Sequence, residues 1–342
     1  MSTSFYPGYL YAWVFWLSMA LGCLGLLILH HVLRARWSRA VLPVLEAGAA
    51  TLPLLMLLYV PVLLGGMVDL YPWAGAHAED PIAAHRAPYL NMPFFVARYV
   101  VFFMIWSGMA WYLIRSRRLH GDAPEAAQAR SNFGSAGLVV FVLTVTFAMT
   151  DWVMTLEKHW GSTIFGVWFI AGQALGALVL ATLWYARRSD AAAETRKDLG
   201  NLMLAFTLFW AYISVSQYLI TWSGNLPEEA SYYLRRSNGG WNGLGGVLIV
   251  GHFLLPFLVL LSGKTKRSPI LLSSVAAWLL LMRALDVYWI VVPSARPGSV
   301  MPTVLDVAVF AVLGAVWMLA YASQLRGSLR DRPVPAGSTA HA

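Results

Sequence analysis

The sequence predicts an all-α integral membrane protein of about nine transmembrane helices, and three observations support this prediction. Hydrophobic residues make up 59% of the 342 positions, whereas charged residues make up only 12%. A soluble domain would carry about 25% charged residues. The apolar residues are grouped into runs of about 20, the length that a helix needs to cross a bilayer. Finally, most of the basic residues lie in every second loop between these runs, on one side of the predicted membrane.

Short polar loops divide the chain into nine apolar segments. No basic region precedes the first segment and no small-residue cleavage site follows it, so we expect a retained helix rather than a signal peptide. The membrane domain is expected over 1–326, and the Pro-, Gly-, Ser- and Ala-rich segment 327–342 is expected to be a disordered cytoplasmic tail. The predicted spans are 10–33, 47–69, 94–114, 134–156, 161–185, 199–221, 243–262, 269–292 and 303–325.

The basic residues predict how the chain is oriented. Of the 24 Lys and Arg residues, 17 lie in one set of loops and 5 in the opposite set, and the two sets alternate strictly along the nine spans. Basic loops stay in the cytoplasm, so the N-terminus is expected outside and the C-terminus inside. Membrane orientation therefore accounts for the net charge of +8, and nucleic-acid binding is not needed to explain it.

Cysteine and histidine usage does not indicate a bound metal or haem. Cys23 is the one cysteine of the sequence, which leaves no pair for a disulfide and no cysteine set for zinc or an iron–sulfur cluster. Two axial haem ligands must lie at the same depth. His30 and His31 are expected at the inner edge, as interfacial residues, whereas His252 lies near the middle of its span. We therefore expect no cofactor held by metal ligands or covalently in this chain.

Charged residues inside the predicted spans are candidates for function, because burying a charge in lipid costs about 2.5–3.5 kcal/mol on insertion scales. Arg283 and Asp286 are three residues apart, so they share a helix face and are expected to pair in a structural or field-setting role. Asp151 has no basic neighbour at helical spacing. It needs a partner on another helix, a proton, or a water-filled cavity, and we assign it to proton transfer.

Two further polar residues belong to this set. His252 is either a hydrogen-bonded core residue or a proton relay. Glu157 follows the fourth span closely, and a solvated helix end is the favoured interpretation for it.

A faint repeat also connects the fourth and eighth spans, which both end on an acid and a tryptophan. Because four spans restore the orientation of the chain, two parallel four-helix bundles would place Asp151 and Asp286 in equivalent positions.

Several segments near the predicted outer boundary resemble one family. It is the second polysulfide-reductase-like (NrfD-like) membrane subunit of alternative complex III, a bacterial quinol:cytochrome c or quinol:oxidase oxidoreductase. The resemblance covers nearly the whole chain, and the WSGNLPEE stretch with the aromatic pair, basic residues and GGW after it is its most specific part. The segments are TDWVMTLEKHWGSTIFG (150–166), SQYLITWSGNLPEEASYYLRRSNGGW (216–241), YLNMPFF (89–95) and WLSMALGCLGLLILHH (16–31).

The resemblance implies a fold and a cellular setting. It implies two four-helix bundles plus flanking helices in a bacterial inner membrane, with no haem or cluster in this subunit. It also implies an NrfD-like membrane partner and iron–sulfur and haem c subunits docked on the periplasmic face. Family members commonly have ten spans, and the nine predicted here are explained by the absence of the first family helix.

Quinol is the substrate class that the resemblance suggests. Either this subunit binds quinol itself or it only conducts protons beside the NrfD-like partner, which the resemblance makes the better candidate for the quinol site. If this subunit binds it, two places could take its ring. One lies around Asp151 and would use Trp152, Met154 and Gln217; the other lies at Arg283 and Asp286. The periplasmic loops 70–93 and 222–242 are expected to dock partner subunits, with Glu228, Glu229, Arg235 and Arg236 in the second loop.

Two alternatives from other classes stay open. A secondary transporter would use midplane charges and a repeat, although the midplane holds few polar residues and no spans are broken by paired Gly or Pro at matching positions. A purely structural anchor would use the buried acids for packing alone. Co-purification distinguishes a transporter, which should purify alone, from an anchor or a redox subunit, which should purify with partners.

Overall fold

The computed structural model describes residues 5–75, 85–158 and 160–330 of the chain. Nine helices in these ranges are long and apolar enough to cross a membrane, and the same ranges contain no strand. The prediction of an all-α membrane protein with about nine spans is therefore confirmed. The last helix continues to Arg330, so the boundary predicted at 326 falls inside a helix. The rest of the predicted tail, 331–342, lies outside the described residues.

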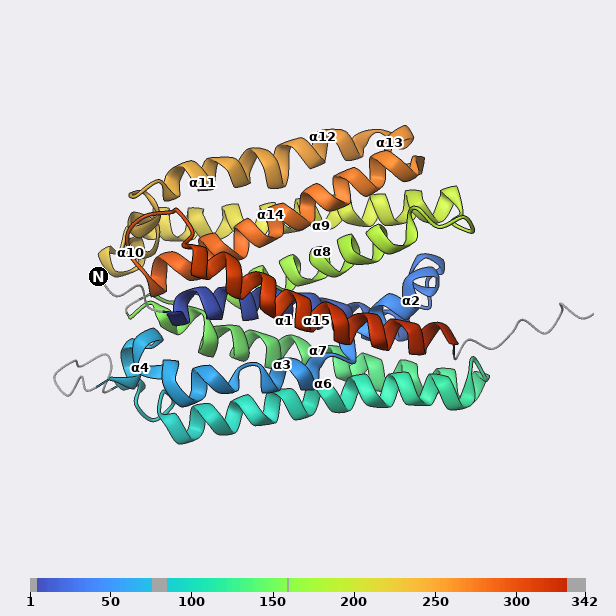
Figure 1. Ribbon diagram of the computed structural model, residues 1–342, viewed down its shortest axis with the longest axis horizontal. Coiled ribbons are helices and arrows are strands. Elements are labelled where there is room, and N and C mark those ends of the chain that lie inside the picture. Colours follow the sequence, from blue (N-terminus) through green and yellow to red (C-terminus); the bar gives the residue numbers. More distant parts are fainter. Residues whose placement is uncertain (1–4, 76–84, 159, 331–342) are drawn as a thin grey trace, which may run out of the picture.

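The nine spans run in chain order through the elements labelled in Figure 1. Six are single helices, and the second, fourth and seventh are composite. The single helices are α1 (Phe5–Leu33), α6 (Met92–His120), α8 (Phe165–Tyr185), α9 (Ala193–Gly224), α14 (Pro269–Ala295) and α15 (Val304–Arg330). The second span joins α2 (Arg36–Ala49), α3 (Leu52–Leu57), η1 (Val62–Gly66) and α4 (Met67–Leu70). The fourth joins α7 (Pro124–Trp152) and η3 (Met154–Leu156), and the seventh joins α11 (Trp241–Val247), η4 (Leu248–Leu254) and α12 (Leu255–Leu261).

Local chemistry sets several helix ends. The Asn91 side chain accepts a hydrogen bond from the Phe94 amide at 3.0 Å, and Ser268 does the same for Leu271 at 3.3 Å. Such caps satisfy amide groups that have no partner within the first turn. At the other end, α9 stops at Asn225, whose φ of 49° lies in the left-handed region that ends many helices. Short helices α10 (Pro227–Arg236) and α13 (Gly263–Arg267) lie in the connections on either side of the seventh span.

The spans form two bundles of four helices with one helix beside them (Figure 1). The first bundle contains α1, the second span, α6 and α7; the second contains α8, α9, the seventh span and α14. The central helices are α1 and α8, which pack against each other and are the most buried of the spans. Gly22 allows this close approach, because a Cβ there would clash with the Gln173 carbonyl oxygen of α8. The ninth span, α15, packs on α1 and α2.

This arrangement agrees with the internal repeat. In the first bundle α1 packs against the second span and α7, and in the second bundle α8 packs against α9 and α14 in the same way. Each bundle also contacts the other through equivalent pairs, α7 with α8 and α14 with α1. The fourth and eighth spans, which carry Asp151 and Asp286, therefore occupy equivalent places.

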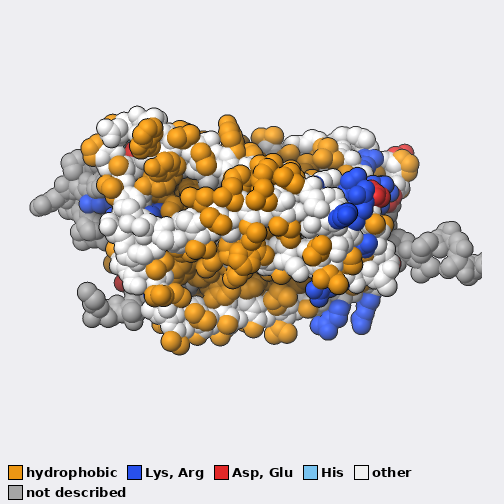
Figure 2. All heavy atoms as spheres, turned by 90° about the horizontal axis from the view of Figure 1, so that it is seen from above, with side chains coloured by type: hydrophobic (Ala, Val, Ile, Leu, Met, Phe, Trp, Pro, Cys, Tyr) orange, Lys and Arg blue, Asp and Glu red, His pale blue; other side chains and the backbone are white. Residues whose placement is uncertain are grey.

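Charge is unevenly distributed over the surface. In Figure 2 the Lys and Arg side chains gather mainly at one end of the molecule, and the middle of the visible face is largely hydrophobic. The basic end carries α13, the turn between α6 and α7, and the start of α2; α4 and α10 lie at the opposite end (Figure 1). The structure thus separates the two sets of loops, and the assignment of the basic end to the cytoplasm stays a prediction.

Two spans contain π-helical turns. One is η1 in the second span, and the other is η4 in the seventh. The second and seventh spans do not occupy equivalent positions in the repeat. Their π-helical turns are therefore not the pair of helix breaks at matching positions that a transporter would have. A π-helical turn opens the regular backbone ladder and is frequent at functional sites. Only η4 borders the cavity described next.

Candidate functional site

The second bundle contains an apolar cavity of about 460 Å³. Its volume lies within the range of about 300–1,000 Å³ that is usual for small-molecule sites. Helices α9, α11 and α14 and the π-helical turn η4 form its walls, and Asp286 is its one charged lining residue. We call it the Asp286 cavity. Its lining residues are Trp168, Trp210, Ala211, Ser214, Val215, Tyr218, Tyr233, Asn242, Gly245, Gly246, Leu248, Ile249, Phe253, Asp286 and Trp289.

Asp286 is held by two donors. Arg283, one turn earlier on α14, forms an ion pair with its Oδ2, and both side chains are almost completely buried. The indole Nε1 of Trp210 on α9 donates a hydrogen bond to the same oxygen at 3.1 Å. The predicted pairing of Arg283 with Asp286 is confirmed. Gly172 on α8 makes room for the guanidinium, because a Cβ there would clash with it.

His252 lies beside this pair. It is fully buried in η4, and its ring meets the Trp210 ring edge-on with 3.9 Å between centroids. Neither ring nitrogen has a hydrogen-bond partner within the described part of the chain. A buried polar group without a partner is costly, which favours a ligand, a water molecule or a proton at this place. Three helices thus bring Trp210, His252, Arg283 and Asp286 together.

The cavity opens sideways on the apolar surface of the bundle. Val215, Tyr218 and Ile249 line it and are 56%, 48% and 62% exposed. All three lie within helices that are long and apolar enough to cross a membrane. A lipid-soluble molecule could therefore enter between α9 and η4 without passing through water. Asp286 lies nine residues from the end of α14 at Ala295, which is about 13 Å along a helix.

Asp151 does not line this cavity, and of the three possibilities named for it the structure shows the first, a basic partner on another helix. Arg98 of α6 binds it with two hydrogen bonds, from Nε to Oδ2 at 2.7 Å and from Nη2 to Oδ1 at 3.1 Å. Arg98 also donates to the Tyr89 carbonyl and lies over the Tyr89 ring at 3.8 Å. Both charged side chains are buried. The ion pair crosses between adjacent antiparallel spans, which is why spacing along one helix did not indicate it.

Trp152, Met154 and Gln217 do not line a common pocket. Trp152 is buried in an aromatic cluster of the first bundle, with Trp13 at 5.0 Å and Phe103 at 5.8 Å between ring centroids. Met154 and Gln217 instead meet through Ser162: the Ser162 amide donates to the Met154 sulfur, and its hydroxyl donates to Gln217 Oε1. The structure therefore does not bring these three residues together, because Trp152 packs inside the first bundle whereas Met154 and Gln217 meet at Ser162.

Glu157 is not at a solvated helix end. It is 3% exposed, accepts a hydrogen bond from Ser294 at 2.7 Å, and lies near both Arg235 and Arg236. Arg236 is buried as well and donates to the carbonyl groups of Trp289 and Ile290 on α14. Burial lowers the pKa of Arg236, and Glu157 opposes this effect. Arg236 therefore fastens α10 to α14 and is not a surface residue available for docking.

Sequence reasoning named Arg283, Asp286 and His252 as separate candidates, did not predict that they lie together, and missed Trp210 and the glycines of α11. A signal was present in GLGG at 243–246, where small residues leave space on a helix.

His30 and His31, expected at the interface, are buried. The described residues contain no group of three or more His, Cys, Asp or Glu side chains placed to hold a metal ion.

No protein-family model and no curated protein matched the chain when it was compared with them.

Proposed function

We propose that this protein is a membrane subunit of a quinol-oxidising respiratory complex and that it binds quinol in the Asp286 cavity. The observation that carries the proposal is the cavity itself: an apolar space of about 460 Å³, open toward lipid, with one buried carboxylate in its wall. The resemblance of the WSGNLPEE segment and its surroundings to an alternative complex III subunit supports the same function.

A quinol fits the chemistry of the walls. Its flat ring can stack on indole and phenol rings, and the cavity offers Trp168, Trp210, Tyr233 and Trp289. Its hydroxyl groups need acceptors, and Asp286 is the charged acceptor in the lining. Its isoprenoid tail needs an apolar exit, which the exposed side chains Val215 and Ile249 would border.

The proposed reaction balances as follows. Oxidation of a quinol to a quinone breaks two O–H bonds and releases two protons and two electrons. Asp286 accepts the hydrogen bond of one hydroxyl group and can receive its proton, while Arg283 remains beside it as a fixed positive charge. The second proton is assigned to the ring of His252, whose two nitrogens have no hydrogen-bond partner among the described residues. The electrons pass to a redox group of a partner subunit, for which the resemblance implies periplasmic iron–sulfur and haem c proteins.

The assignment of proton transfer to Asp151 depended on a carboxylate without a partner. Arg98 supplies that partner, and Asp151 is not among the residues that line the Asp286 cavity. In the proposed function Asp286 is therefore the acid near the substrate, and Asp151 stabilises the first bundle. Trp210 and Arg283 both donate to Oδ2 of Asp286, which leaves Oδ1 available for a ligand.

The two alternatives are less well supported. A transporter of soluble substrates needs a polar binding site reached from water, whereas the Asp286 cavity has apolar walls and an apolar rim. A purely structural anchor gives no reason for an open cavity beside a buried ion pair. Purification under mild conditions should yield this chain together with redox subunits; purification of the chain alone would favour the transporter.

A substitution that fills the cavity tests the quinol site. A Cβ added at Gly246, which lines the cavity, meets no atom within 4 Å, so Gly246→Leu should fold and fill the space. Gly243→Leu is the matched control, because Gly243 lies on the same helix α11, has equally open surroundings and does not line the cavity.

The measurement is a titration of purified protein with short-chain benzoquinone and naphthoquinone analogues, followed by quenching of tryptophan fluorescence. We expect Gly246→Leu to weaken binding of one analogue at least about tenfold, a loss of about 1.4 kcal/mol. The Gly243→Leu protein should bind like the unsubstituted protein. Equal affinity in all three proteins, or no binding of either analogue, would refute the proposed site.

A further inference from the structure

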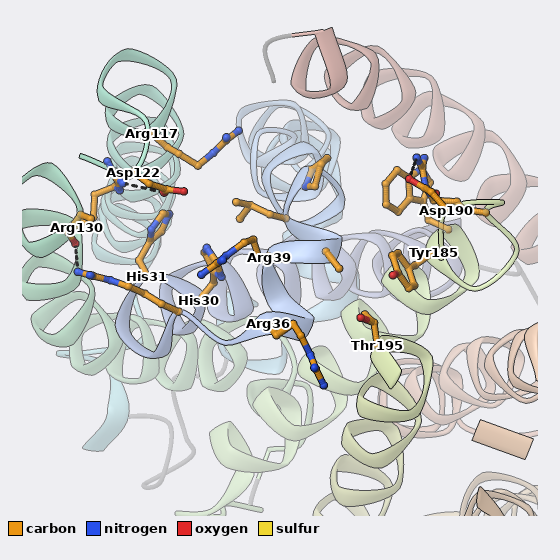
Figure 3. Close-up of a pocket in the computed structure, with 17 residues that line it drawn as sticks. His30, His31, Arg36, Arg39, Arg117, Asp122, Arg130, Tyr185, Asp190 and Thr195 are labelled. Carbon is orange, nitrogen blue, oxygen red and sulfur yellow. Dashed lines mark hydrogen bonds and ion pairs between the residues drawn. The ribbon is translucent and has the colours of Figure 1, made fainter. Parts of the chain in front are cut away.

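A second cavity, of about 730 Å³, lies at the basic end of the molecule. It is formed where the ends of α1 and α8, the starts of α2 and α9, and the turn between α6 and α7 come together (Figure 3). We call it the basic cavity. Its lining residues are His30, His31, Arg34, Arg36, Arg39, Ala40, Leu42, Pro43, Arg117, Asp122, Ala127, Arg130, Trp184, Tyr185, Arg188, Asp190 and Thr195.

Arginine dominates the charge of this lining, and most of the arginines are paired. Arg36 meets Asp198 at 3.0 Å, Arg188 meets Asp190 at 2.9 Å, and Arg130 lies 3.8 Å from Asp122. Arg117 pairs with the buried Glu46. Arg34 and Arg39 form no ion pair with a described carboxylate. The six guanidinium groups therefore exceed these four carboxylates by two positive charges.

The two arginines without a carboxylate are positioned differently. Arg34 has a φ of 50°, a left-handed conformation that L residues rarely adopt, and one guanidinium nitrogen donates to the Ala127 carbonyl at 2.6 Å. That bond joins the connection between α1 and α2 to α7. Arg39 is exposed and its side chain makes no hydrogen bond with any described residue, and in Figure 3 it lies near the middle of the cavity. Both groups retain donors for an anion.

A buried histidine provides an independent sign of a ligand. His31 lines the cavity and is 4% exposed, yet its Nε2 has no hydrogen-bond partner among the described residues. The neighbouring His30 is satisfied, because its Nδ1 bonds the Ser38 hydroxyl at 2.7 Å. A ligand oxygen near His31 would complete its hydrogen bonding.

The cavity also has an apolar side. Leu42, Pro43 and Trp184 contribute to its lining, and Arg188 lies over the Trp184 ring at 4.5 Å. The last turns of α1 and α8 place it at the level where headgroups meet hydrocarbon. Guanidinium groups bind phosphate oxygens through paired hydrogen bonds, and basic pockets between membrane helices suit phospholipid headgroups.

We propose that the basic cavity binds a doubly charged phosphate-bearing anion through Arg34, Arg39 and His31. The ligand chemistry is a pair of phosphate groups or one doubly ionised phosphate. Its source is either an anionic phospholipid headgroup or a free phosphate compound in the cytoplasm. This site is separate from the Asp286 cavity and does not depend on quinol binding.

The test uses the full-length protein in two arms. In the first arm, native mass spectrometry counts diphosphatidylglycerol molecules retained from mixed micelles, with phosphatidylcholine as the neutral comparison. In the second arm, calorimetry measures inorganic pyrophosphate binding in neutral detergent. We expect the unsubstituted protein to retain the anionic lipid or to bind pyrophosphate. Retention in the first arm alone identifies a lipid headgroup, and binding in the second identifies a free phosphate compound.

Substitutions locate the anion. Arg34→Gln with Arg39→Gln should weaken binding at least tenfold, and Arg39→Gln alone, which removes no described contact, should weaken it about threefold. The matched control is Arg187→Gln with Arg326→Gln, which removes two charges from the same end and leaves the lining intact. An equal loss in the control would show that only general surface charge attracts the anion. That result, or the absence of binding in both arms, would overturn the proposal.

Discussion

The indole nitrogen of Trp210 donates a hydrogen bond to Asp286 Oδ2 at 3.1 Å, across the boundary between α9 and α14. This contact determines which face of the carboxylate remains open. Arg283 and Trp210 occupy one oxygen, and the other is directed to neither of them. The same indole ring packs against His252, so one tryptophan connects an acid, a buried histidine and the wall of the Asp286 cavity.

Replacing Trp210 with phenylalanine tests this connection. Trp210→Phe keeps an aromatic ring in the wall and leaves the Arg283–Asp286 pair intact, but it removes the donor. We expect the free energy of unfolding to fall by about 1 kcal/mol, the usual net value of such a bond. We also expect quinone affinity to fall, because Arg283 alone then orients the carboxylate. Thermal unfolding and a quinone titration measure the two effects; unchanged values for both would contradict the assigned role.

The removal of either acid should destabilise the bundle that contains it. Asp151→Asn leaves Arg98 buried without a charged partner, and Asp286→Asn does the same for Arg283. Breaking a buried pair in this way costs about 3–5 kcal/mol. The two variants should differ in binding: Asp286→Asn alters quinone affinity, whereas Asp151→Asn leaves it unchanged. If Asp151→Asn abolished binding in a folded protein, the substrate site would lie in the first bundle.

A double substitution distinguishes pairing from an essential charge at Asp151. Replacing both partners, Arg98→Met with Asp151→Leu, removes the desolvation cost together with the attraction, so it should be much less destabilising than Arg98→Met and Asp151→Leu added together. Thermal unfolding of the single and double variants gives the coupling. A double variant as unstable as the sum of the single ones would show that the two side chains stabilise the fold independently.

The two arginines that end α10 should differ in role, one structural and one exposed. Arg236→Gln removes bonds to α14 and leaves Glu157 buried beside one remaining arginine, so we expect a loss of about 3 kcal/mol. Arg235 is 41% exposed, and Arg235→Gln should cost less than about 1 kcal/mol. Partner docking at this loop is therefore better tested with Glu229→Gln and Arg235→Gln than with a set that includes Arg236. A complex that purifies unchanged from that double variant would show that the loop does not dock a partner.

The predicted orientation has its own test. A reporter fused after Arg267 should remain cytoplasmic, and one inserted near Asp80, which lies outside the described residues, should be exported. Activity of both reporters on the same side would contradict the nine-span topology.

Features that depend on one helix were predictable from the sequence. The nine spans follow from the length of apolar runs, and the Arg283–Asp286 pair follows from a three-residue spacing. Features that depend on how helices meet were not predictable in this way. Arg98 lies 53 positions from Asp151, and Trp210 lies 76 positions from Asp286, so no periodicity connects them.

The position of the cavity could not be inferred for a similar reason. Asp151 and Asp286 are equivalent in the repeat, but Arg98 holds both carboxylate oxygens of the first, and the adjacent Trp152 packs in an aromatic cluster with Phe103. Glycines 245 and 246 leave space near the second. Which of two equivalent acids borders a cavity depends on side-chain volumes contributed by several helices, and this information appears only when the helices are packed.

The most direct test of the quinol site is to locate a bound quinone. The purified protein, or the complex that contains it, is irradiated with a quinone that carries a photoreactive azido group on its ring, and the labelled peptides are identified by mass spectrometry. We predict labelling of the α9, α11–η4 and α14 segments that line the Asp286 cavity, with protection by excess unlabelled quinone and loss of labelling in Gly246→Leu. Protectable labelling confined to the first bundle, or labelling that Gly246→Leu leaves unchanged, would contradict the account.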